Sequence, residues 1–113
     1  MHCGWGAMVL CVALADWAGI AAQQPAGVAA GRKVYEREKC ATCHQIARLG
    51  NSRFPLDGVA SRLTADQMRR WITETAKMEA ALPRMPAVRM SVQKYRLKPT
   101  DLDVLVEYLQ TLK

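Results

Sequence analysis

The pentapeptide CATCH, residues 40–44, places two cysteines and a histidine within five positions of one another. Three kinds of chemistry use such a pattern: a redox-active disulfide between the cysteines, part of a zinc site, or covalent attachment of haem. In the third case Cys40 and Cys43 add to the two vinyl groups of one porphyrin, and His44 reaches the iron from the same face. The pentapeptide alone does not decide among these three, so the rest of the chain must.

The first 22 residues differ in composition from the remainder of this 113-residue chain. Residues 7–22 are apolar and rich in small side chains, and every Lys and Arg lies at or beyond Arg32. This asymmetry predicts a cleaved secretory signal over residues 1–22, followed by a single domain over residues 23–113. The apolar run is shorter than the roughly 20 residues that span a bilayer and contains Asp16, so we expect no transmembrane anchor after cleavage. The mature protein would be periplasmic or secreted.

Cleavage would leave few side chains that could bind a metal through nitrogen or sulfur. The other two cysteines and the other histidine lie within the predicted signal, so the mature chain would have these residue types only in CATCH. Zinc sites use three or four ligands in a tetrahedral arrangement, which five consecutive residues do not provide. A thioredoxin-like disulfide follows a strand, whereas residues 30–40, AGRKVYEREKC, read as a charged helix. Covalent haem uses all three residues and is the favoured interpretation, with a thiol–disulfide protein as the alternative.

Hydrophobic periodicity predicts an all-α domain of three or more helices. The first helix spans Ala26–Lys39, and Gly31 within it indicates that another backbone approaches closely. The second helix begins at Thr64, which forms a capping box with Gln67. The last helix begins near Thr100 and carries a leucine-rich stripe.

Two long loops are predicted between these helices, over residues 45–63 and 82–98. Loops of this length are poorly supported in a bare polypeptide this small. Wrapping around a haem would account for them, because the macrocycle adds a large apolar body to the core.

At this point the mature chain resembles the class I c-type cytochromes, specifically the small bacterial secreted ones, from AAGRKVYEREKCATCH to RLKPTDLDVLVEYLQTLK. The resemblance implies the cytochrome c fold, with helices and long loops wrapped around one haem c that is attached through Cys40 and Cys43 and bound by His44. It implies that a proline carbonyl accepts a hydrogen bond from the other nitrogen of this histidine, and Pro55 matches that proline. For Trp71 the two interpretations are core packing and contact with the haem, and packing in the core beside the haem would satisfy both. The first and last helices would pack through Gly31, Tyr35, Leu105 and Tyr108.

The resemblance further implies a methionine as the second axial ligand of the iron, which would favour the ferrous state. Met68 lies on the apolar stripe of the second helix, and Met78 lies in or just after that helix, so both are poorly placed. Met85 and Met90 lie in the loop before the last helix, where the family has its ligand. Met85 is followed by proline, but Met90 has the better spacing to Tyr108, so we predict Met90 as the ligand, with Met85 as the alternative.

The function implied by the resemblance is that of a one-electron carrier, not an enzyme, whose haem cycles between Fe(III) and Fe(II) with His/Met ligation. The alternatives are a haem enzyme with an open distal site, such as a peroxidase, and the thiol–disulfide protein. The formal charge of +6 becomes about +7 without Asp16, which predicts docking on acidic patches of redox partner proteins. We expect a monomer and no nucleic-acid partner.

Overall fold

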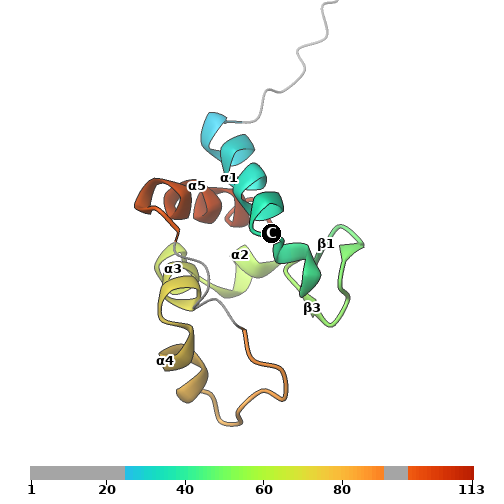
Figure 1. Cartoon of the computed structure of the whole chain (residues 1–113), viewed down its shortest axis with the longest axis vertical. Helices are drawn as coiled ribbons and strands as arrows, with labels where there is room; N and C mark the ends of the chain where they lie inside the picture. The colour runs from blue at the N-terminus through green and yellow to red at the C-terminus, as the bar shows by residue number, and fades with distance from the viewer. Residues whose placement is uncertain (1–24, 91–96) are drawn as a thin grey trace, which may run out of the picture.

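The computed structural model describes residues 25–90 and 97–113, so the predicted signal and its cleavage site lie outside the described residues (Figure 1). In chain order the elements are α1 (Ala26–Arg37), a 3₁₀ helix η1 (Cys40–Thr42), β1 (His44–Ile46), β2 (Leu49–Gly50), β3 (Phe54–Pro55), α2 (Val59–Arg62), α3 (Ala65–Thr73), α4 (Thr75–Ala80) and α5 (Pro99–Leu109). The helical fold is as expected. The small sheet, however, lies where the sequence predicted only a loop. No helix within the described ranges is long and apolar enough to cross a membrane.

Helices α1 and α5 cross in the most extensive contact between two elements of the described chain (Figure 1). At the crossing, Gly31 lies so close to α5 that a Cβ at this position would overlap the carbonyl oxygen of Val104 and the Cβ of Tyr108. Beside it, the rings of Tyr35 and Tyr108 pack edge to face with their centroids 5.8 Å apart. The predicted backbone approach at Gly31 is therefore confirmed, and it sets the distance between the two helices.

The hydrophobic core lies between these two helices and the middle of the chain. Its buried members come from α1, α2, α3 and α5, and they are Val34, Tyr35, Val59, Met68, Leu105, Val106 and Leu109. Burial of such side chains is the main favourable contribution to folding. The core thus joins segments from both ends of the described chain.

Helix α3 begins at the predicted capping box. The Thr64 hydroxyl accepts a hydrogen bond from the Gln67 backbone N–H at 3.2 Å, and the Gln67 side-chain oxygen accepts one from the Thr64 backbone N–H at 2.9 Å. Two backbone donors that the helix would otherwise leave unpaired are thereby satisfied. Glu74 then interrupts the helical conformation, with φ −123° and ψ 37°, and separates α3 from the short helix α4.

The three-stranded sheet has the order β2-β1-β3, with β1 antiparallel to β2 and parallel to β3. Strands β1 and β2 form a hairpin in which Ile46 pairs with Leu49. The two residues of the turn, Ala47 and Arg48, both have positive φ, 49° and 66°. Such turns usually contain Asn or Gly, and neither is present at these two positions, which explains why a hairpin is not predicted here.

Candidate functional site

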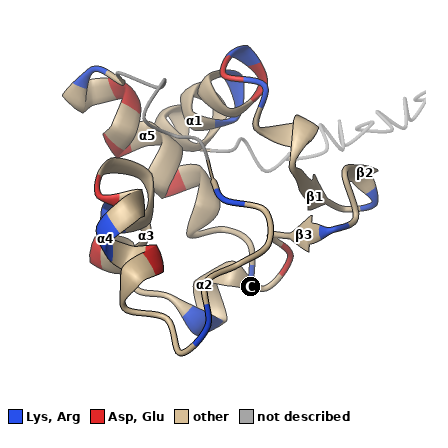
Figure 2. Cartoon of the chain, turned by 60° about the horizontal axis from the view of Figure 1, so that its bottom comes forward, with Lys and Arg blue, Asp and Glu red and all other residues tan. Residues whose placement is uncertain are grey.

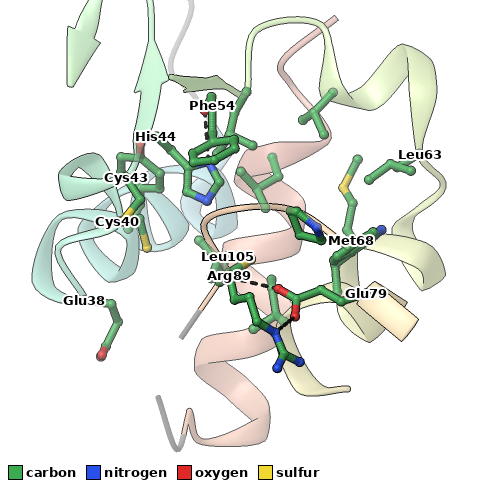
Figure 3. Close-up of a pocket in the computed structure, with 18 of the residues that line it drawn as sticks. Glu38, Cys40, Cys43, His44, Phe54, Leu63, Met68, Glu79, Arg89 and Leu105 are labelled. Atoms are coloured by element: carbon green, nitrogen blue, oxygen red, sulfur yellow. Dashed lines mark hydrogen bonds and ion pairs between the residues drawn. The ribbon is translucent and has the colours of Figure 1, made fainter. Parts of the chain in front are cut away.

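A cavity of about 400 Å³ lies at the centre of the described chain, within the range of about 300–1,000 Å³ that is usual for cofactor sites (Figure 3). Its walls are mainly apolar and come from every helix, including Leu63 of the α2–α3 connection, Ile72 of α3 and Leu105 of α5. Figure 3 shows the side chains of CATCH on one side of the cavity and Met68 and Glu79 on the other. The two cysteines and the histidine of CATCH thus face an apolar, partly enclosed space.

Both cysteines of CATCH line this cavity. They stand at the start and just beyond the end of η1, where the Cys43 N–H donates to the Cys40 carbonyl at 3.1 Å. Residues three apart in a 3₁₀ turn lie one above the other, so the two side chains leave the backbone on the same side. Both are free thiols. The segment therefore presents two parallel thiols to whatever occupies the cavity.

Burial, together with the nearby charge of Glu38, raises the pKa of the Cys40 thiol to about 11. The attacking species in disulfide exchange is the thiolate, and active cysteines of that class have lowered pKa values. The surroundings of Cys40 therefore do not favour a thiol–disulfide protein. Within residues 25–90 and 97–113, no cluster of three or more His, Cys, Asp or Glu side chains could hold a metal ion in the manner of a zinc site.

His44 is held by the backbone of strand β3. Its Nδ1 lies 3.0 Å from the carbonyl oxygen of Phe54, and this bond is the dashed line at the top of Figure 3. A carbonyl can only accept, so Nδ1 carries a proton, and in the neutral imidazole Nε2 then has the lone pair. This is the arrangement of a metal-binding histidine, whose second nitrogen usually donates to a carbonyl or carboxylate.

The acceptor is not the one that the sequence predicted. Pro55 was expected to provide the carbonyl, but it is exposed and is not among the residues that line the cavity. The cause is the parallel register of β1 and β3, in which Phe54 pairs with His44 and Pro55 pairs with Gln45. The predicted role is therefore shifted by one residue, from Pro55 to Phe54.

The structure separates the candidate methionines. Met90 lines the cavity, whereas Met85, in the same loop, is 51% exposed and does not line it. Met68 also lines the cavity but is a core residue, 2% exposed, as its position on the second predicted helix indicated. Trp71 is half-buried and lines the cavity as well. Ligation of iron by Met90 remains a prediction, but its position agrees with that role better than the position of Met85 does.

Sequence reasoning missed Glu79 and Arg89, which also line the cavity. The Glu79 residue is only 2% exposed, and its carboxylate accepts hydrogen bonds from Arg89 Nε at 2.7 Å and from the Met90 backbone N–H at 2.9 Å. The hydrogen bond from Arg89 holds the pKa of Glu79 below its usual value. The sequence carried no signal for this burial, because a glutamate in a short helix usually faces solvent.

A further observation concerns the Tyr35 hydroxyl, which is buried at the cavity wall and has no hydrogen-bond partner among the described residues. An unpaired buried hydroxyl costs about 1–3 kcal/mol, so native structures rarely leave one without a partner. A covalently attached haem fits the groups at this cavity, which are two adjacent thiols, an imidazole, a methionine sulfur and an apolar wall. The orphaned hydroxyl of Tyr35 is consistent with a cavity that is filled when a cofactor is bound.

In the comparison with known protein families, the family model described as Cytochrome c matches residues 28–113, which include both CATCH and the terminal helix. No curated protein and no solved structure matched the chain significantly.

Proposed function

Because the chain belongs to the cytochrome c family, whose members are in general haem-based electron carriers, we propose that it carries single electrons by means of one haem c. The thioether links would be made by Cys40 and Cys43, and the axial ligands would be His44 and Met90. The observation that supports this proposal most strongly is the convergence of all four side chains on one apolar cavity. When bound, the haem would supply the Fe(III)/Fe(II) couple.

The residues of the chain would hold this couple in a fixed environment. The Phe54 carbonyl, 3.0 Å from His44 Nδ1, fixes the orientation of the imidazole and makes Nε2 more basic. A thioether such as that of Met90 is a soft, neutral ligand that stabilises the ferrous state and raises the reduction potential. The apolar wall acts in the same direction, because it disfavours the additional charge of the ferric state.

A carrier is favoured over a haem enzyme by the groups on the Met90 side of the cavity. A peroxidase-like reaction needs an open coordination position and an acid or base free to move a proton. The carboxylate and the guanidinium that line this side, from Glu79 and Arg89, are hydrogen-bonded to each other. Neither is available as a free proton donor or acceptor, so the site supports ligation better than catalysis.

The proposal extends to location and partners. We place the mature protein in the periplasm or outside the cell, as a monomer, in accordance with the sequence. Its formal charge of +6 would attract acidic docking patches on redox partner proteins. Figure 2 shows Lys and Arg distributed over helices and loops. At the cavity, Lys39 and Arg89 are balanced by Glu38 and Glu79, so the attraction would come from the surface as a whole and not from the cavity side.

The test is a set of absorption spectra from protein produced together with a haem-attachment system. The wild type should contain covalent haem and show a low-spin spectrum with the weak near-infrared band of sulfur-to-iron ligation. Met90→Ala should lose that band, and Met85→Ala, a matched change in the same loop, should keep it. Loss of the band only in Met85→Ala would reverse the ligand assignment.

Two other outcomes would overturn the proposal itself. A high-spin ferric spectrum in the wild type, with ready binding of peroxide or cyanide, would indicate the enzyme. Production without any attached haem would indicate the thiol–disulfide protein.

A further inference from the structure

The buried carboxylate of Glu79 ties helix α4 to the backbone at Met90. Its Oε1 accepts the Met90 N–H at 2.9 Å, and its Oε2 accepts Arg89 Nε at 2.7 Å (Figure 3). The acceptor and its two donors are ten and eleven residues apart in sequence, so the pair of bonds closes the loop that follows α4. Each carboxylate oxygen has a partner, which satisfies the general requirement for a buried charge.

Little else in the described structure holds this loop. Its side chains include three of the exposed large apolar residues of the described chain, Leu82 at 39%, Met85 at 51% and Val88 at 42%. Leu82 and Val88 line the cavity, so a bound haem would cover them, whereas Met85 does not line it. Hydrogen bonds that involve a charged group are shorter and about twice as strong as neutral ones, so the two bonds to Glu79 are strong polar ties between this loop and α4.

From these contacts we infer that Glu79 is a positioning residue that holds the Met90 sulfur within reach of the haem iron, through the Met90 backbone and with Arg89 as its counter-ion. The inference rests on the proposed function, because it requires Met90 to be the axial ligand. Without the carboxylate, the Met90 backbone would lose its tie to α4, and only the bond between sulfur and iron and the apolar contacts of the loop with the haem would hold the methionine in place. The methionine would then leave the iron more often, and other ligands would take its place.

Competition by imidazole measures this effect directly, because imidazole binds ferric iron only where the methionine has left. Loss of one charge-assisted hydrogen bond shifts such an equilibrium by about tenfold or more. We therefore expect Glu79→Ala to bind imidazole at least about tenfold more tightly than the wild type and to show a weaker sulfur band. Glu79→Gln should show a smaller increase, because its amide oxygen can still accept the Met90 N–H.

The matched control is Glu74→Gln, which makes the same charge change at the start of the same helix. Glu74 is exposed and pairs with Arg70 and Lys77, at 3.2 and 4.0 Å, away from Met90. The Glu74→Gln variant should bind imidazole with the same affinity as the wild type. If Glu79→Ala does not accumulate as folded protein, the imidazole affinity of Glu79→Gln decides the test, since glutamine has nearly the same volume as glutamate.

The outcomes separate this inference from the proposed function. If Met90→Ala loses the sulfur band while Glu79→Ala and Glu79→Gln keep wild-type imidazole affinity, the role of Glu79 is refuted and the carrier stands. If Met90→Ala keeps the band, the ligand assignment fails first. An equal gain of affinity in Glu74→Gln would also refute the inference, because the effect would then follow net charge and not the contact with Met90.

Discussion

Substitution of Gly31 by alanine should separate the two terminal helices. A Cβ at residue 31 would overlap the carbonyl oxygen of Val104 and the Cβ of Tyr108, and both atoms are anchored in helix α5. A flexible side chain could move aside, but a backbone carbonyl within a helix cannot do so without moving the helix. The methyl group can therefore be accommodated only if α1 and α5 move apart.

The net change in the free energy of unfolding is the difference between a packing cost and a gain in helix propensity. Overpacking of a tightly packed contact costs typically about 1–3 kcal/mol, and the rigidity of the atoms at this crossing places Gly31→Ala near 3 kcal/mol. Alanine is favoured over glycine inside a helix by about 0.5–1 kcal/mol, which offsets part of this cost. We expect the free energy of unfolding to fall by about 2 kcal/mol. For a domain of this size, such a loss lowers Tm by roughly 8–16 °C.

The assay is thermal unfolding of the haem-containing protein, followed by circular dichroism. Ala29→Gly, at an exposed position of the same helix, isolates the helix-propensity term and should cost only about 0.5–1 kcal/mol. A Gly31→Ala variant that is more stable than the wild type would refute the reasoning. In that case only the propensity gain would be present, and the close contact would not constrain the helices.

Two further predictions concern the turn at Arg48 and the buried ring of Tyr35. Arg48→Gly should raise the unfolding free energy by about 1 kcal/mol in denaturant titrations, because Arg48 has φ 66° and only glycine adopts that region freely. The same change at Arg53, which lacks a positive φ, should lower it, and a loss in both would contradict the argument. Burial raises the pKa of Tyr35 to about 12 from 10, so the unfolded chain loses this proton first as pH rises, and stability should fall between about pH 10 and 12. Tyr35→Phe should flatten that fall in denaturant titrations, whereas an unchanged pH dependence would show that Tyr35 does not cause it.

The features that could be predicted from the sequence are those with a signal within one short stretch of residues. The capping box of Thr64 and Gln67 was predicted because its donors and acceptors are three residues apart. The approach at Gly31 was predicted because a glycine inside a helix needs a packing reason. The three possible chemistries of CATCH could be reduced to a favoured one, because its reactive side chains lie within five consecutive residues.

The features that could not be predicted depend on how two segments pair when neither segment carries a signal for the pairing. Whether Phe54 or Pro55 faces His44 is set by the register of two short parallel strands, which have no hydrophobic alternation to fix it. The burial of Glu79 depends on where the chain returns at residues 89–90, and nothing in the short helix α4 indicates that return. Sequence reasoning is therefore weakest for the groups around the reactive side chains.

The contact between α1 and α5 also has a consequence for how the protein folds. Tyr35 and Tyr108 are about 70 positions apart, so closing the core requires a long segment of chain to lose its freedom before the contact is made. Proteins dominated by such distant contacts fold more slowly than bundles of neighbouring helices. Tyr35 of α1 and Leu105 of α5 also line the cavity, so a chain without either helix would lose part of the cavity wall. During synthesis, the cavity can be completed only after α5 has been made.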